Sequence, residues 1–94
     1  MGAPENYVEQ YLHDQAVKNG MLCYKLRSPA NNGLPDRMLI SKDGTVCFVE
    51  TKRKDGKLSA VQRVVIRDML MHNANVKTAY TRDEADKLIT ELKG

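Results

Sequence analysis

The sequence predicts one α/β domain, residues 1–94, in which helices flank a mixed sheet in the order α-β-β-β-α-β-α. Three segments carry apolar residues at the helical period, and four shorter segments are expected to be strands. The two central strand segments are apolar on both faces, so helices are expected on both sides of the sheet. With 41% hydrophobic and 29% charged residues, the 94-residue chain has the composition of a globular domain with one modest core.

The first predicted elements are a helix and a strand. The helix runs from Pro4 to Asn19, because proline suits a first helical turn, apolar residues recur after it, and Gly20 follows as a C-cap. Residues 21–26 are rich in apolar and aromatic side chains and form a strand. Residues 27–35 contain two prolines, a glycine and two asparagines, a composition typical of a loop.

A β-hairpin follows this loop. Residues 36–41 and 45–52 are expected to be its strands, and Lys42-Asp43-Gly44 fits the connection, a type I turn with Gly44 in the left-handed conformation. Ser41 then pairs with Thr45, so the numbers of paired residues sum to 86. This register is the basis of the site proposed below.

The second half of the chain predicts a helix, a strand and a last helix. The first of these helices spans Ser59 to His72. Four of its apolar residues are expected on the side toward the core: Val61, Val65, Met69 and Leu70. A strand over residues 76–80 follows, and Thr81 with Glu84 forms a capping box at the start of the last helix. The apolar stripe of that helix consists of Ala85, Leu88, Ile89 and Leu92.

The charge of the chain is unevenly distributed. The net charge is +3, but the segment from Lys25 to Arg67 holds ten basic and four acidic residues, a balance of +6, whereas the remainder carries −3. Such asymmetry is typical of a face that binds a polyanion. Surface lysines and arginines that only solvate strand ends and loops would give the same count, so composition leaves both interpretations open.

Several classes of protein are not expected. Apolar runs are only a few residues long, so no segment is predicted to span a membrane, and no membrane partner is expected. Residues 1–20 lack the apolar stretch of a secretory signal. Cys23 and Cys47 lie in apolar surroundings and are expected to be free thiols, and the two histidines stand apart, without zinc-site spacing.

The hairpin register brings together three charged side chains that could act on a substrate. Asp36 lies directly opposite Glu50, and Lys52 projects from the same face two residues further on. Two adjacent carboxylates repel each other unless a cation lies between them. Oxygen ligands with open positions suit Mg²⁺ or Mn²⁺, and the carbonyl of Thr51 is a candidate further ligand. Such an ion lowers the pKa of bound water, which Lys52 would orient or deprotonate.

The same residues also have an interpretation without chemistry. Charged side chains at strand ends often extend into solvent, and an ion pair between Asp36 and Lys52 would contribute less than about 1 kcal/mol. A register shifted by one residue would place Asp36 opposite Thr51, and Asp36 would no longer lie beside Glu50 and Lys52. The residues alone therefore leave a catalytic and a structural interpretation open.

Three stretches of the sequence, GLPDR (33–37), FVETK (48–52) and LSAVQ (58–62), together resemble a known family. Their order and spacing are similar to those of the VRR-NUC (virus-type replication-repair nuclease) family of the PD-(D/E)XK superfamily, and the resemblance extends over nearly the whole chain. It implies a restriction-endonuclease-like fold and metal-dependent cleavage of DNA. Small stand-alone members are typical of phages and bacteria, and some resemble Holliday-junction resolvases that act as dimers.

The resemblance implies roles for individual residues. Asp36 and Glu50 correspond to the metal ligands and Lys52 to the catalytic lysine. Gln62 corresponds to an accessory residue that reaches toward the site, although Ser59 and Gln62 also form a capping box with a purely structural role.

A glutamate on the first helix belongs to the same pattern, as a catalytic group and metal ligand. Glu5 fits best, because Val8 and Leu12 follow at the offsets of the pattern, and Glu9 is a substitute one turn further along. The family often has a branched apolar residue where this chain has Thr51. The Thr51 side chain is expected to point away from the site, so this difference from the family is not expected to abolish activity.

The predicted function is that of a metal-dependent DNA endonuclease, selective for branched DNA such as Holliday junctions, with Mg²⁺ or Mn²⁺ as cofactor. A homodimer is expected, because cutting two strands symmetrically requires two sites, and the apolar residues of the second helix or Tyr11 are its candidate interface. The expected location is the cytoplasm of a bacterium or of a phage-infected host.

Phosphate contacts are expected from basic residues around the site: Arg37, Arg53, Lys54, Lys57 and Arg63. Arg37 and Lys25 could instead line the cleft or pair with the acidic residues. The alternative function is a nucleic-acid-binding module without turnover that uses the basic segment 25–67. That alternative gives no reason for two carboxylates to face each other beside a polyanion, which they would repel without a metal ion.

Overall fold

A computed structural model describes residues 7–27, 33–53 and 55–94 of the chain. Its elements follow the predicted order: α1 (Tyr7–Lys18), β1 (Leu22–Lys25), β2 (Arg37–Ile40), β3 (Val46–Thr51), α2 (Ala60–Met71), β4 (Val76–Ala79) and α3 (Arg82–Lys93). Each strand is shorter than predicted by one residue at one or both ends, and the predicted helix start at Pro4 lies outside the described residues. Within these ranges no helix has the length and apolar character needed to cross a membrane.

The sheet is mixed, with the strand order β1-β2-β3-β4. β1, β2 and β3 form antiparallel pairs, and β4 joins the edge of β3 in parallel. The predicted hairpin register is confirmed, because Arg37 pairs with Val49 and Ile40 with Val46. The turn sets this register: the amide of Ser41 donates to the carbonyl of Thr45 at 2.9 Å, and Gly44 adopts a φ of 88°.

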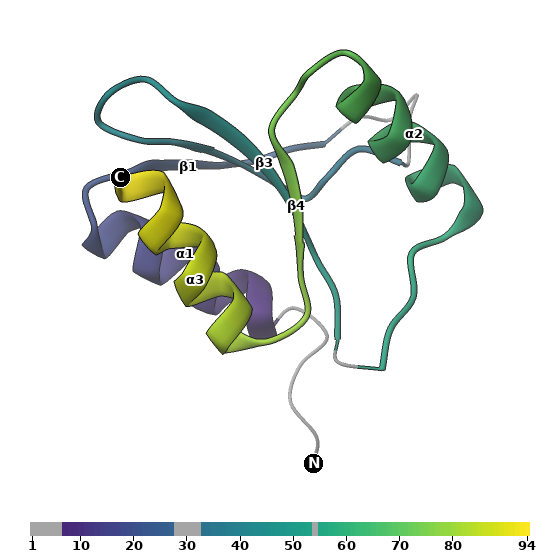
Figure 1. Ribbon diagram of the computed structural model, residues 1–94. Helices are drawn as coiled ribbons and strands as arrows, with labels where there is room; N and C mark the ends of the chain where they lie inside the picture. Colours follow the sequence, from purple (N-terminus) through teal and green to yellow (C-terminus); the bar gives the residue numbers. More distant parts are fainter. Residues whose placement is uncertain (1–6, 28–32, 54) are drawn as a thin grey trace.

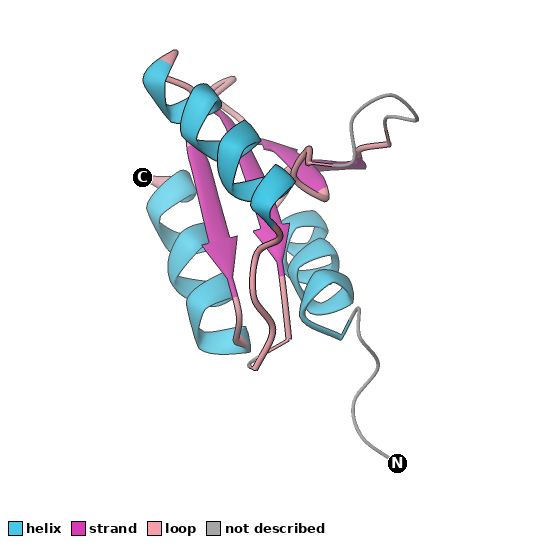
Figure 2. Cartoon of the chain, turned by 90° about the vertical axis from the view of Figure 1, so that its right-hand side faces the viewer, coloured by secondary structure: helices cyan, strands magenta, loops and turns pink. Residues whose placement is uncertain are grey.

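The core lies between the sheet and two helices. α1 and α3 pack side by side on one face of the sheet, and α2 lies on the other (Figures 1 and 2). Fully buried residues of this core come from α1, the two central strands and the helix–strand pair at the end of the chain: Leu12, Ala16, Leu39, Cys47, Val49, Ala79 and Ala85. The predicted apolar stripe of the last helix is confirmed, because Ala85, Leu88 and Ile89 are buried and Leu92 packs against them.

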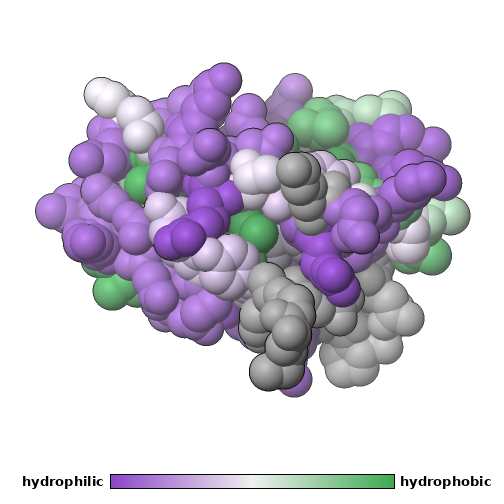
Figure 3. Space-filling view, turned by 90° about the horizontal axis from the view of Figure 1, so that it is seen from below, coloured by the Kyte–Doolittle hydropathy of each residue, from purple (hydrophilic) through white to green (hydrophobic). Residues whose placement is uncertain are grey.

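The predicted buried side of α2 is wrong in part. Val61 and Leu70 are 52% and 51% exposed, Val65 and Met69 are half-buried, and no residue of this fully described helix is buried. The helical period correctly indicates an apolar face, but α2 packs mainly against the edge strand β4, so much of that face has no cover. Seen from below, the molecule is mostly hydrophilic, and hydrophobic side chains gather on the side where Figure 1 places α2 (Figure 3).

The start of α2 is positioned by a close backbone approach. A Cβ atom on Gly33 would lie 2.8 Å from the carbonyl oxygen of Val61 and 2.6 Å from a methyl group of Val65. Only a residue without a side chain fits at such a distance from another main chain. The loop that leads into β2 therefore packs directly against the first turns of α2, beside the site described next.

The contrast between the two sides of the sheet predicts the effect of two identical truncations. Leu39→Ala should lower the free energy of unfolding by about 2–5 kcal/mol, because Leu39 is fully buried against α1 and α3. In the monomer, Leu70→Ala should change it by less than about 1 kcal/mol, because there that side chain is already half in water. Urea denaturation of both variants measures the difference, and equal losses would show that α2 is covered in solution.

Candidate active site

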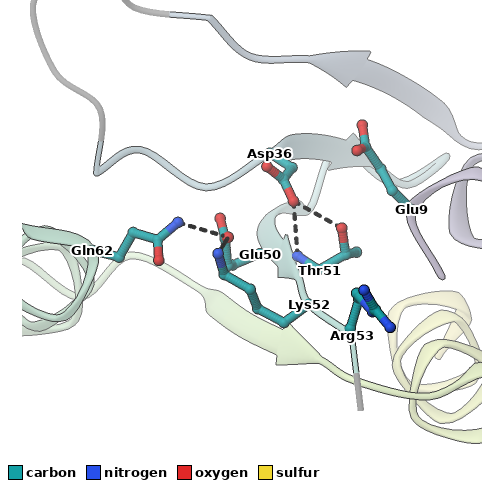
Figure 4. Close-up of a pocket in the computed structure, with 7 residues that line it drawn as sticks. All are labelled: Glu9, Asp36, Glu50, Thr51, Lys52, Arg53 and Gln62. Atoms are coloured by element: carbon teal, nitrogen blue, oxygen red, sulfur yellow. Dashed lines mark hydrogen bonds and ion pairs between the residues drawn. The ribbon is translucent and has the colours of Figure 1, made fainter. Parts of the chain in front are cut away.

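A cleft of about 410 Å³ opens at the end of the hairpin that is opposite to its turn (Figure 4). The strand ends of β2 and β3 form its floor, α1 lies on one side and the first turn of α2 on the other. Seven residues line it: Glu9, Asp36, Glu50, Thr51, Lys52, Arg53 and Gln62. The structure thus brings together Asp36, Glu50, Lys52 and Gln62, as the sequence predicts.

Glu50 is the most unusual group in the cleft. Glu50 is only 1% exposed. Its Oε2 accepts a hydrogen bond of 2.9 Å from Gln62 and lies 3.5 Å from the Lys52 ammonium. Its Oε1 is buried and has no hydrogen-bond partner among the described residues. Burial, and then the negative charge of Asp36, raises the pKa of the Glu50 carboxyl to about 7, although Lys52 acts in the opposite direction.

Gln62 holds Glu50 and caps its own helix at the same time. Its Oε1 accepts a 2.8 Å bond from the amide of Ser59, and the Ser59 hydroxyl accepts one from the amide of Gln62, which completes the capping box. Its Nε2 is left free to donate to Glu50. The two roles predicted from the sequence therefore use different atoms of one side chain, and the capping bonds fix the orientation in which the amide reaches Glu50.

Asp36 is held by Thr51, and this corrects the expectation that the Thr51 side chain points away from the site. The hydroxyl and the amide of Thr51 both donate to Asp36 Oδ2, at 2.8 and 3.0 Å (Figure 4). Asp36 lies one residue before β2 begins, so its side chain is beyond the regular ladder and lies along the end of β3. Side chains alternate between the two faces of β3, and this places Glu50 and Lys52 together as predicted. At Asp36, outside the regular strand, the alternation no longer determines where the side chain points.

Glu9 lines the cleft, but its charge is already balanced. Its buried carboxylate accepts a 2.7 Å bond from Lys25 and a 2.8 Å bond from Arg37, both to Oε2. Arg37, expected among the phosphate contacts, is thus turned inward with only 13% of its side chain exposed, which is the pairing with acidic residues considered above. Glu5 lies outside the described residues. Lys25, for which lining the cleft and pairing with acidic residues were both considered, likewise pairs with Glu9.

The other described basic residues that were predicted to contact phosphate lie at the cleft, before α2 or on its first turn. Arg53 lines it with a side chain that is 57% exposed, and its guanidinium lies 3.9 Å from Asp55, too far for a strong bond. Lys57 and Arg63 are exposed on the segment that leads into α2 and on its first turn, and Lys54 lies outside the described residues. These side chains can reach a bound anion without first breaking a buried ion pair.

The donor set of the cleft fits a hard divalent cation. No group of three or more His, Cys, Asp and Glu side chains among the described residues is arranged as a metal cage. Asp36 and Glu50 offer two carboxylates, and the partnerless Oε1 of Glu50 is the kind of buried oxygen that a cation would satisfy. Mg²⁺ typically binds one or two carboxylates and keeps several waters, so two carboxylates in an open cleft suit it.

The mixed sheet with this carboxylate and lysine cluster defines a domain with a nuclease-type fold. A solved structure described as a "VRR_NUC domain" has a similar fold, with a TM-score of 0.83 and 29% sequence identity, over 92% of this chain and 94% of that one. The resemblance drawn from the sequence is thereby confirmed: the chain is similar to a VRR-NUC domain in sequence and fold over nearly its whole length.

One relative found by sequence is also named as a nuclease. The protein named "Putative nuclease p44" of Acyrthosiphon pisum secondary endosymbiont phage 1 is 34% identical over 58 residues, which make up 62% of this chain. The match also spans 62% of the length of the phage protein. No family model matches the chain.

The raised pKa of Glu50 predicts a pH-dependent stability in the presence of EDTA. Because this pKa is about 7 in the folded chain and the ordinary value is 4.5, the stabilisation is complete below about pH 4.5 and is lost as the pH rises to 7. The free energy of unfolding should fall by up to about 3 kcal/mol over that range. Glu50→Gln should remove this part of the pH dependence.

Urea denaturation between pH 4.5 and 8 gives the free energy of unfolding of the unmodified chain and of Glu50→Gln. The difference between the two values isolates the effect of Glu50, because the other titrating groups contribute equally to both. Glu91→Gln, on the exposed side of α3, serves as the control and should follow the unmodified chain. Parallel curves for the chain and Glu50→Gln would show that the Glu50 carboxyl is solvated and titrates normally.

Proposed function

We propose that this domain is a metal-dependent nuclease that hydrolyses phosphodiester bonds of DNA at the Asp36–Glu50–Lys52 cluster. The observation that supports this most directly is the buried Glu50 Oε1, which has no hydrogen-bond partner among the described residues and lies in an open cleft beside a second carboxylate. A buried carboxylate oxygen without a partner lowers the stability of a small domain, and binding of a cation is a function that explains its presence. The fold match and the phage relative support the same class of activity.

Each residue of the cleft has a role in this proposal. Asp36 and Glu50 would hold the ion, with the Thr51 carbonyl as a further ligand and a glutamate of the first helix, Glu5 or Glu9, acting directly or through water. Bound Mg²⁺ or Mn²⁺ supplies an acidic water and neutralises phosphate charge.

Lys52 and Gln62 act around the Glu50 carboxylate. Lys52, 26% exposed, has its ammonium 3.5 Å from Glu50 Oε2, where it can orient the attacking water or stabilise the developing charge. Gln62 keeps Glu50 in place through Nε2. The hydrogen-bonding side chains are thus arranged before the substrate arrives.

We further propose that the substrate is branched DNA, such as a Holliday junction. Arg53 lines the cleft, and Lys57 and Arg63 are exposed before α2 and on its first turn, so that together they can contact more than one phosphate backbone. The basic segment would supply most of the affinity, which should therefore fall steeply with salt.

Cleavage assays test the activity and its site together. The protein is incubated with end-labelled four-way junctions, flaps, linear duplexes and single strands in Mg²⁺, Mn²⁺ or EDTA. Cleavage should require the divalent ion and should be fastest on branched DNA. Asp36→Asn and Lys52→Ala should each lower the rate by about 100-fold or more, because general acid–base and electrostatic contributions are of this size.

Lys18→Ala, at the exposed end of α1 far from the cleft, is the matched control for the loss of a lysine and should cut like the unmodified chain. Cleavage that persists in both site variants would place the activity elsewhere or in a contaminant. Salt-sensitive binding without cleavage in either metal would favour the binding module that uses residues 25–67.

We also propose that the domain acts as a two-fold homodimer through the exposed face of α2. Four residues of that helix are exposed apolar side chains: Val61, Val64, Leu70 and Met71. The other candidate, Tyr11, is already engaged, since its hydroxyl donates to Asp86 at 2.6 Å and Arg82 lies 4.6 Å from its ring centroid. An isologous interface on α2 would place two clefts on one DNA junction.

Light scattering at micromolar concentration tests this assembly. The chain should have twice its 10.6 kDa mass, and Leu70→Asp should shift it toward the monomer, because a charge in an apolar interface is strongly unfavourable. Val17→Asp, an exposed apolar residue on α1, is the control and should stay dimeric. A monomer mass for the unmodified chain would contradict the proposal.

A further inference from the structure

The two hydrogen bonds that hold Asp36 go to the same oxygen. The Thr51 hydroxyl lies 2.8 Å from Asp36 Oδ2, and the Thr51 amide lies 3.0 Å from that atom. No donor in the described parts of the chain bonds to Oδ1. In Figure 4 the free oxygen is turned away from Thr51. One residue therefore makes the two oxygens of this carboxylate different from each other.

This difference has a consequence for any cation in the cleft. An ionised carboxylate accepts about two hydrogen bonds at each oxygen, so the two bonds from Thr51 fill the lone pairs of Oδ2. A cation can then approach only Oδ1, as a monodentate contact. The carboxylate also cannot rotate freely, because rotation would break both bonds.

Thr51 is well suited to fix this orientation. Its amide belongs to the last residue of β3, which is paired with Ala79 in the parallel ladder, and the residue is buried. Its branched Cβ restricts the hydroxyl to few rotamers. The branched apolar residue often found at this position in the family offers the amide bond and the same shape, but no second donor.

We infer that Thr51 is a positioning residue, whose hydroxyl orients Asp36 so that Oδ1 faces the divalent ion. This inference rests on the proposed function, because it assumes that Asp36 is a ligand. It assigns the Thr51 side chain to the organisation of the site, in addition to the backbone carbonyl considered above. Loss of a group that orients a metal ligand commonly weakens metal binding by about 10- to 100-fold.

Calorimetric titration of Mn²⁺ into the metal-free protein tests the inference without any assay of cleavage. Thr51→Val keeps the branched shape and the amide bond but removes the hydroxyl, and it should weaken Mn²⁺ binding by about tenfold, the low end of that range. Thr51→Ser restores the hydroxyl and should bind within about twofold of the unmodified chain. In the Asp36→Asn background, Thr51→Val should have no additional effect, because the two residues act as one unit.

Thr45→Val is the matched control. At the other end of the same hairpin, the Ser41 hydroxyl donates to Asp43, and the amide of Thr45 donates to the same carboxylate at 3.0 Å; these bonds, that of Ser41 most of all, lower the pKa of Asp43 to about 2. The same chemical change is thus made far from the cleft, and Mn²⁺ affinity should not change. Should Thr51→Val fail to fold by circular dichroism, Thr51→Ala compared with Thr51→Ser removes and restores the same hydroxyl.

Two results would overturn the inference. Equal Mn²⁺ affinity for Thr51→Val and the unmodified chain would show that the hydroxyl has no effect on the ligand. Equal weakening in Thr51→Ser, which keeps the hydroxyl, and in Thr51→Val, which lacks it, would show that the hydroxyl is not what determines the affinity. A different result, in which Asp36→Asn itself binds Mn²⁺ normally, would contradict the proposed metal site and so is distinguishable from a failure of Thr51.

Discussion

The burial of one carboxylate, Glu50, is the constraint on which the arrangement of this domain depends. Glu50 lies near the end of β3, which has β2 on one side and β4 on the other, so its side chain cannot reach solvent along the sheet. A buried carboxylate is unfavourable unless its oxygens have partners. Gln62 and Lys52 serve only Oε2, and no partner of Oε1 is found in the described chain. The fold therefore retains a group that reduces its stability, as functional sites often do.

The same constraint explains how α2 is attached. This helix buries none of its residues, so apolar packing holds it only weakly. Its first turn is instead fixed by Gln62, which joins the helix cap to Glu50, and by the close approach of Gly33. A polar contact thus couples the position of α2 to the geometry of the cleft. Anything that covers the exposed face of α2 would act on Glu50 through this contact.

Much of this arrangement could be predicted from the sequence, and the limits have physical causes. The three-residue turn ending in Gly44 determines the register of β2 and β3, and the alternation of faces then places Glu50 and Lys52 together. Beyond the last ladder pair these rules no longer hold, so the contact between Thr51 and Asp36 was not predicted. Helical periodicity identified the apolar face of α2, but it contains no information about which element covers that face.

The pairing of Glu9 resolves the conflict between a polyanionic substrate and an acidic cleft. Arg37 lies two residues before the buried Leu39 in β2 and therefore points to the same face, toward α1, a signal that was available in the strand pattern. There, with Lys25, it neutralises Glu9. The remaining acidic groups of the cleft are Asp36 and Glu50, with Lys52 beside Glu50 and the exposed Arg53 also lining the cleft. A divalent ion bound between those two carboxylates would reverse the sign of the potential where the phosphate must bind.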